Sequence, residues 1–163
     1  MSNNLNKLTK SILEKNQYMT IGSSDGEGNA WVSPVTYAYD KKLNFYFVSH
    51  TDSKHCRNIE KNKRVSLAIF DSRQLIGDGV GLQIEGIAKK VKIIEVSKAA
   101  ATYFRRKYPF GKLNQVGAVN AALKQLLNKK LYWFYKITPS KIWLNNPNSN
   151  IDERIEINLN KIL

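Results

Sequence analysis

The sequence contains a single cysteine, Cys56, which excludes a disulfide within the chain and a zinc site built from several thiolates. Scarce cysteine is typical of proteins from a reducing compartment. No apolar run approaches the roughly 18–20 residues that span a bilayer, and residues 1–16 lack the apolar core of a signal peptide. We therefore expect a cytoplasmic protein with no membrane attachment.

Acidic residues are also scarce, because 13 Asp and Glu stand against 26 Lys and Arg, a formal charge of +13. Such a charge favours anionic partners, among them nucleic acid, an acidic membrane surface and phosphorylated small molecules, and it says nothing about the fold. Aromatic residues are plentiful, as expected of a packed core. The length suits one domain, 1–163, with an N-terminal helix over 4–16 and a C-terminal tail over 146–163.

Apolar alternation and turn residues predict a mainly β chain. The first helix, capped by Asn4, precedes strands that short turns join without intervening helices, which favours an antiparallel barrel. Further helices are predicted over 97–108, with Ser97 as cap, and over 118–129. The predicted strands are 18–24, 30–39, 43–49, 64–70, 80–94, 131–137 and 141–145, with a short edge strand within 152–159.

Pro34 falls within the second predicted strand. Because proline cannot donate a ladder hydrogen bond, this strand must face a sheet edge, a bulge or a ligand there, and the residue type alone favours an edge or bulge.

The connection "SHTDSKHCRNI", residues 49–59, is rich in hydroxyls and cations. It predicts a short helix with Thr51 or Asp52 as N-cap and Ile59 facing the core. The first turn of a helix has unpaired N–H groups and partial positive charge, so it attracts anions such as a phosphate monoester. A capped helix with solvated basic side chains explains the pattern equally well. The polar residues around this point are Ser49, Thr51, Ser53, Lys54, His55 and Arg57.

Five segments in register resemble the FMN-binding split barrel of the pyridoxamine 5′-phosphate oxidase-like family. The closing segment "YWFYKITPSKIWL" is similar to the last hairpin of that family, and the resemblance covers roughly residues 17–145. The five segments are Val32–Val35, Val48–Ser49, Ser53–Ile59, Asn62–Ser66 and Gln83–Ala88.

The resemblance implies a mainly β (α+β) fold, a six-stranded antiparallel Greek-key split β-barrel with peripheral helices. It also implies a homodimer with FMN at the subunit interface, acting as an oxidoreductase on a small molecule or with a nicotinamide donor. The residues that match the phosphate-binding positions of the family, Ser49, Ser53 and Lys54, would hold the phosphate of FMN. The flavin ring would lie against the backbone of Val32–Val35, and Gln83 would reach it from the same or the opposing subunit. The implied cofactor-binding residues are Val32, Ser33, Pro34, Val35, Val48, Ser49, Thr51, Ser53, Lys54, His55, Asn58 and Gln83.

Three departures separate the chain from the pyridoxine phosphate oxidases themselves. The strand "WVSPVTY" lacks their phosphate-binding Arg and Lys, His55 stands where they have Lys, and "DERIEINL" does not match their C-terminal substrate motif. We therefore expect a flavoprotein that is not a true pyridoxine phosphate oxidase, with phosphate binding resting mainly on Lys54. Its substrate and catalytic residues are not identified by the sequence.

Other interpretations stay open. A basic barrel could bind single-stranded nucleic acid through "RRKYPFGK", residues 105–112, although such a run more often is a solvated helix end. Some similar split barrels bind haem or the deazaflavin F420, or store flavin. His50 and His55 lie near no acidic cluster, so no metal site is predicted, and Cys56 is expected to be a packing residue. Trp143 would either fill the dimer interface or form one wall of the flavin site.

Overall fold

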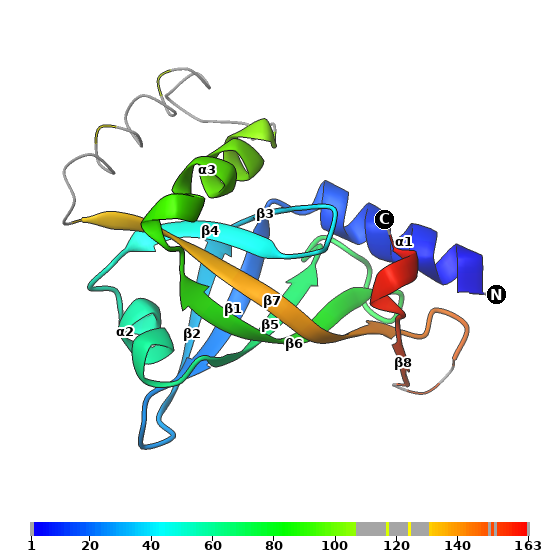
Figure 1. Cartoon of the computed structure of the whole chain (residues 1–163). Coiled ribbons are helices and arrows are strands. Elements are labelled where there is room, and N and C mark those ends of the chain that lie inside the picture. The colour runs from blue at the N-terminus through cyan, green and yellow to red at the C-terminus, as the bar shows by residue number, and fades with distance from the viewer. Residues whose placement is uncertain are drawn as a thin grey trace.

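A computed structural model describes residues 2–106, 117, 124, 131–149, 151 and 153–162. Figure 1 shows a curled antiparallel sheet with α2 at one end, α1 at the other and α3 alongside β4. The helices are α1 (Ser2–Lys15), α2 (Lys54–Lys61) and α3 (Val96–Arg105), with 3₁₀ turns at Ile93–Glu95 and Leu159–Lys161. The strands are β1 (Tyr18–Ser24), β2 (Ala30–Thr36), β3 (Ala38–Tyr39), β4 (Phe45–His50), β5 (Arg64–Phe70), β6 (Gly81–Lys90), β7 (Tyr132–Asn145) and β8 (Arg154–Glu156).

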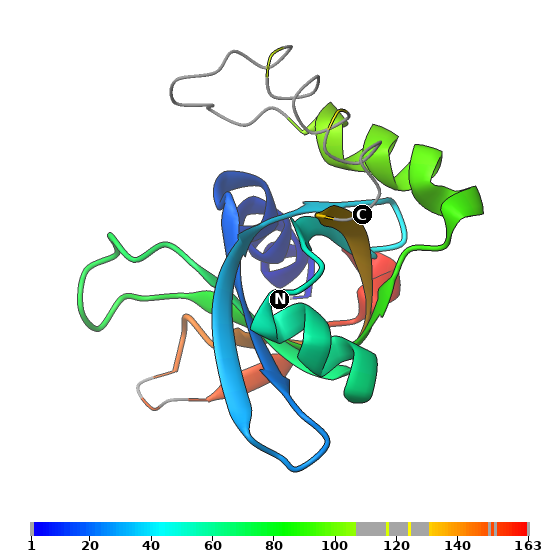
Figure 2. The same ribbon diagram turned by 90° about the vertical axis from the view of Figure 1, so that its left-hand side faces the viewer.

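The strands follow the order β2-β1-β5-β6-β7-β4-β3, and β8 pairs with the end of β7. The sheet curls until β2 contacts β4, yet these two strands share no ladder in the described sheet. Figure 2 looks onto this region, where α2 lies beside β2. The predicted split barrel is therefore confirmed: six long strands form a half-barrel, and β3 and β8 are short additions.

The core forms because alternate residues of each strand turn inward. Ile21, Phe47, Leu67 and Ile84 come from four different strands and are at most 3% exposed. α1 adds Ile12 and Leu13 to the same cluster through the helical spacing that the sequence shows. Cys56 is fully buried there, as the predicted packing role requires.

The late hairpin predicted from 131–137 and 141–145 is wrong, because β7 runs unbroken through Pro139. Proline is tolerated here for two reasons. Pro139 pairs with Gly86 of β6 at a shift in the register. It also lies between the part of β7 that pairs with β4 and the part that pairs with β8, so no strand needs its missing N–H on that side. Gly86 permits the close approach, since a Cβ there would lie 2.9 Å from the carbonyl oxygen of Thr138.

Several predicted boundaries need correction. The first helix begins at Ser2 and so includes Asn4, and α3 has Glu95 rather than Ser97 as its N-cap. The strand predicted over 80–94 ends at Lys90, because a 3₁₀ turn follows. The predicted edge strand is only three residues long. The helix predicted over 118–129 falls mainly outside the described residues.

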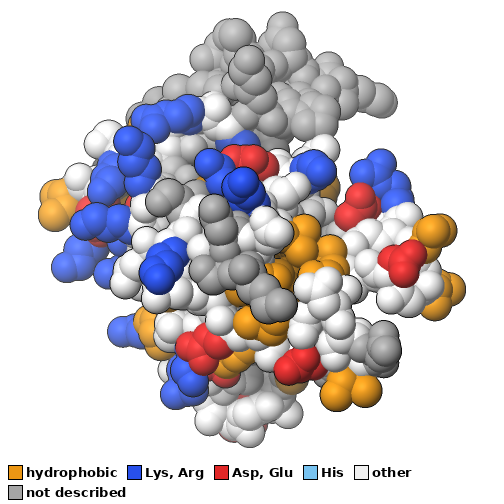
Figure 3. Space-filling view, turned by 90° about the vertical axis from the view of Figure 1, so that its right-hand side faces the viewer, with side chains coloured by type: hydrophobic (Ala, Val, Ile, Leu, Met, Phe, Trp, Pro, Cys, Tyr) orange, Lys and Arg blue, Asp and Glu red, His pale blue; other side chains and the backbone are white. Residues whose placement is uncertain are grey.

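Part of the positive charge lies on the side of the molecule away from α2. Figure 3 looks at the side of the molecule that carries α1, away from α2, and blue basic side chains gather along one edge of this view. The large positive charge therefore does not by itself locate a ligand site.

Candidate phosphate and cofactor site

The candidate site begins where β4 ends and α2 starts. The amide of Asp52 donates to Nδ1 of His50 at 3.2 Å and the amide of Ser53 donates to the carbonyl of His50 at 3.0 Å, which forms a tight turn. The N-cap of α2 is consequently Ser53, not Thr51 or Asp52 as predicted. The Ser53 side chain makes no capping hydrogen bond, so the first N–H groups of α2 have no side-chain acceptor from their own cap.

The Ser53 hydroxyl instead belongs to a triangle of polar atoms. Its Oγ lies 3.3 Å from Oγ of Ser49 and 3.2 Å from Nε2 of His55, and the Ser49 Oγ to His55 Nε2 distance is 2.8 Å. The sequence placed these three residues in one candidate site, and the fold brings them into contact. Two hydroxyls and one ring nitrogen thus lie beside an uncapped helix start.

His55 is enclosed, with only 8% of its surface exposed. Its ring centroid lies 6.0 Å from that of Phe47 on β4, which covers it on the core side. Burial lowers the pKa of His55 below its ordinary value of 6.5, because desolvation disfavours the imidazolium. The ring is therefore neutral near pH 7 in the free protein.

Lys54 is the first residue of α2, and its side chain lies against β2. Its Nζ lies 4.5 Å from the centroid of the Trp31 ring, a cation–π contact. The indole Nε1 of Trp31 donates to Oγ of Ser33 at 3.0 Å, which fixes the plane of the ring. Trp31 is a site residue that the sequence did not reveal, because this contact joins two elements and has no local pattern.

Other predicted residues have partners outside this triangle. Arg57 donates to the carbonyl of Asp52 at 2.5 Å, and buried Asn58 donates to Oγ of Ser23 at 3.3 Å, so Asn58 packs α2 against β1. Val48 is half-buried against the α3 cluster. The amide of Thr51 donates to the carbonyl of residue 131 at 2.9 Å. A cofactor contact by any of them stays a prediction.

The predicted flavin-contacting segment lies on β2, at one edge of the sheet order. Val32 and Pro34 point outward, with Val32 62% exposed, whereas Ser33 and Val35 point into the barrel. The edge that Pro34 requires is therefore present. The segment offers backbone and two outward side chains to a ligand.

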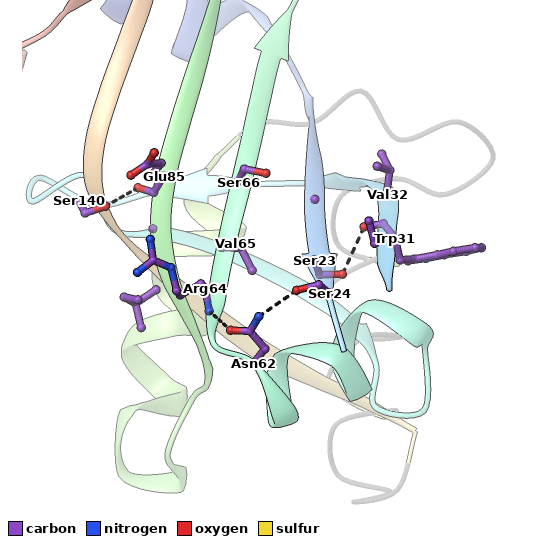
Figure 4. Close-up of a pocket in the computed structure, with 14 residues that line it drawn as sticks. Ser23, Ser24, Trp31, Val32, Asn62, Arg64, Val65, Ser66, Glu85 and Ser140 are labelled. Carbon is purple, nitrogen blue, oxygen red and sulfur yellow. Dashed lines mark hydrogen bonds between the residues drawn. The ribbon is translucent and has the colours of Figure 1, made fainter. Parts of the chain in front are cut away.

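Gln83 lies on the outer face of β6, where its Oε1 accepts from Nε of Arg154 at 3.0 Å. It shares a hollow of about 420 Å³ with Val32 and Trp143. A second hollow, about 650 Å³, lies on the same face and is lined by Trp31, Val32, Ser66 and Glu85 among others (Figure 4). Gln83 thus lies near Val32 on the outer face, and the hollow that they share is not lined by Ser49, Ser53 or His55.

A second contact that the sequence did not reveal ties α3 to β2. Oγ1 of Thr36 and the hydroxyl of Tyr103 lie 2.5 Å apart. Arg106 at the end of α3 donates to the carbonyls of Leu13 and Tyr37, both at 2.9 Å. Arg106 is therefore not the solvated cation that its sequence context suggested.

Within the described residues, no helix is long and apolar enough to cross a membrane. No group of three His, Cys, Asp or Glu side chains in the same part of the chain could hold a metal ion.

The fold and the helix-start geometry define a split-barrel protein. The model of the pyridoxamine 5′-phosphate oxidase family matches residues 5–144, and the chain belongs to this family. None of the curated proteins matches the sequence.

Solved structures repeat the fold at low identity. A Clostridium acetobutylicum protein related to general stress protein 26 of B. subtilis, of the pyridoxinephosphate oxidase family, is 10% identical over 100% of both chains, with a TM-score of 0.69. A heme-binding protein from Mycobacterium smegmatis is 15% identical, with a TM-score of 0.72, over 96% of this chain and 59% of its own. HutZ, the heme storage protein of Vibrio cholerae, is 15% identical over 83% and 91%, with a TM-score of 0.66.

Proposed function

We propose that the chain is an FMN-binding flavoprotein that acts as a homodimeric oxidoreductase on a small molecule. The observation that carries this proposal is the triangle of Ser49, Ser53 and His55 beside the uncapped start of α2, with Lys54 next to it. Family membership supports the same cofactor.

The donor set fits a phosphate monoester. Such a group has several acceptor oxygens and nearly two negative charges at neutral pH, and it is bound by hydroxyls, helix N–H groups and a cation. Ser49 and Ser53 would supply the hydroxyls, and Lys54 the charge. The hydroxyl of Ser53 is directed to this cluster and not to its own helix, which agrees with a role in ligand binding.

The flavin ring would lie along the free edge of β2. Backbone groups at an edge strand have no ladder partner on one side, so they are available to the polar edge of a planar ring. Bound FMN supplies the redox chemistry, and the chain needs only to hold it and limit access to it. This division of labour explains why no catalytic acid or base stands out.

The outer face of the sheet supports a second copy of the chain as partner. Val32, Gly22 and Ser66 are aligned across three strands, and all three line both hollows of this face. Large exposed apolar side chains stand at outward-facing strand positions of this face. They are Tyr18, Val32, Phe70 and Ile87, each at least 45% exposed.

Haem is the second candidate, because two structural neighbours are named for it. The two histidines do not fit it as they stand. Nδ1 of His50 accepts a hydrogen bond from Asp52, which places the ring proton on Nε2, whereas an iron-ligating histidine donates from its second nitrogen. Nε2 of His55 is enclosed by Ser49 and Ser53. This geometry favours FMN.

The test is the visible absorption spectrum of the protein as purified, and again after addition of FMN and desalting. We expect a two-band flavin spectrum retained at about one FMN per chain, and a dimer by light scattering. An intense haem band would show that the protein binds haem in place of FMN. No retained chromophore would overturn the proposal and make F420 and single-stranded oligonucleotides the next ligands to test.

A further inference from the structure

Each serine hydroxyl of the triangle carries one hydrogen, and Nε2 of His55 lies within hydrogen-bonding distance of both oxygens. A neutral ring without a hydrogen on Nε2 accepts the hydrogen of one serine. That serine can then no longer donate to an anion. Both hydroxyls are free to donate when Nε2 carries a hydrogen and donates it to a serine oxygen, as it does in the imidazolium and in the neutral tautomer protonated at Nε2. Only the imidazolium also brings a positive charge to a bound anion.

We propose that His55 is a positioning residue that directs the hydroxyl hydrogens of Ser49 and Ser53, and that anion binding at the start of α2 takes up a proton at His55. This inference rests on the proposed phosphate site and adds a pH-dependent control to it. His55 would act through the two serines, unlike the direct cationic contact expected from its place in the sequence.

The surroundings of the ring explain why a proton is taken up. Phe47 covers the ring on the core side, and the neighbouring strand β4 otherwise presents the hydroxyl of Ser49. The nearby cation Lys54 is turned to Trp31, and Arg57 is turned to the carbonyl of Asp52. Desolvation is the cause of the low pKa of His55 in the free protein. A phosphate with nearly two negative charges reverses that balance, since a nearby opposite charge favours the imidazolium.

The sign of the pH dependence follows. With His55 neutral in the free protein and protonated in the complex, affinity falls as pH rises through the pKa of the complex. One linked proton changes the affinity by at most about tenfold per pH unit. The phosphate itself loses its second proton near pH 6, so measurements between about pH 7 and 8.5 isolate the contribution of the histidine.

The experiment is calorimetric titration of the full chain with FMN in buffers that differ in ionisation enthalpy, across this pH range. We expect uptake of a fraction of a proton, up to about one, per FMN bound. His55→Gln retains a polar terminus near the position of Nε2 but cannot titrate there, so it should bind FMN without proton uptake and with a flat pH profile. His50→Gln, the matched control, should retain the uptake.

The outcomes separate the two proposals. FMN binding by the wild-type protein without proton uptake overturns the role of His55 and leaves the flavin proposal standing, and uptake that persists in His55→Gln does the same. Absence of FMN binding overturns both. Loss of uptake in His50→Gln together with retained uptake in His55→Gln assigns the proton to His50 and also overturns the inference.

Discussion

The ammonium of Lys54 lies 4.5 Å from the centre of the Trp31 ring, so the first residue of α2 is held against the edge strand β2. This contact joins the two segments that the proposed cofactor would bridge, the phosphate end at α2 and the ring along β2. A cation held in place costs less conformational entropy on ligand binding than a free lysine does.

Lys54 is expected to carry the main charge interaction with the phosphate. Lys54→Ala should weaken FMN binding by about 1.5–3 kcal/mol, the range for hydrogen bonds to charged groups, which is roughly 10- to 150-fold in Kd. Flavin-fluorescence titration measures it. Lys61→Ala, at the other end of the same helix, is the control and should change the affinity less than about twofold. Equal affinities for the two variants would remove Lys54 from the site.

Trp31 is expected to strengthen FMN binding because its ring holds the ammonium of Lys54 in place. An exposed cation–π contact contributes about 0.5–1 kcal/mol, so Trp31→Leu should weaken FMN binding by roughly two- to fivefold and Trp31→Tyr should weaken it less. In the double variant with Lys54→Ala, the effect of Trp31→Leu should largely disappear, because its partner is absent. Strictly additive losses would show that the tryptophan acts independently of Lys54.

Arg106 stabilises the fold by joining the ends of α1 and α3. It donates to the carbonyls of Leu13, Glu14, Asn16 and Tyr37, and its guanidinium lies 4.4 Å from the Tyr37 ring centre. Arg106→Ala should lower the free energy of unfolding by about 2–3 kcal/mol, since a charged donor is lost and several carbonyls lose their partner. Urea denaturation of this variant and of the exposed neighbour Arg105→Ala provides the comparison. A loss of similar size at Arg105 would contradict this role.

Gly86 is required by the close approach of β6 to β7. A Cβ at this position would lie 2.9 Å from Cγ2 of Ile137 and 2.9 Å from the carbonyl oxygen of Thr138, which is backbone and cannot move aside cheaply. Gly86→Ala should therefore destabilise the protein by about 1–3 kcal/mol. Gly79→Ala has open space around its Cβ and a permissive backbone, so its melting temperature should stay near that of the wild type.

His55 makes stability depend on pH. Its pKa is lowered by burial in the folded protein, so the unfolded chain binds more protons, and its contribution to stability is complete above about pH 6.5 and declines as the pH falls toward the folded-state pKa. His55→Gln should flatten this decline in denaturation curves measured between pH 7.5 and 5.5. A decline of unchanged slope in the variant would assign the acid sensitivity to other groups.

Local patterns in the sequence predicted most of the fold. Residues 64–70 and 18–24 alternate strongly, and each forms a strand with the predicted bounds. The errors occurred where a distant partner decides the outcome: Pro139 suggested a break, yet β7 continues because Gly86 on β6 allows a bulge opposite it. Thr51 and Asp52 are reasonable caps by type, but the hydrogen bonds that His50 accepts move the helix start to Ser53.

The sequence by itself determined that the chain is mainly β, that residues 49–59 hold a polar helix start, and that Ser49, Ser53 and His55 belong to one candidate site. It could do so because strand periodicity and helix starts depend on neighbours along the chain. The tertiary structure alone decided that Lys54 stacks on Trp31 and that Arg106 binds the end of α1. Contacts between elements depend on how the sheet curls, and the curling follows from the packing of the whole core.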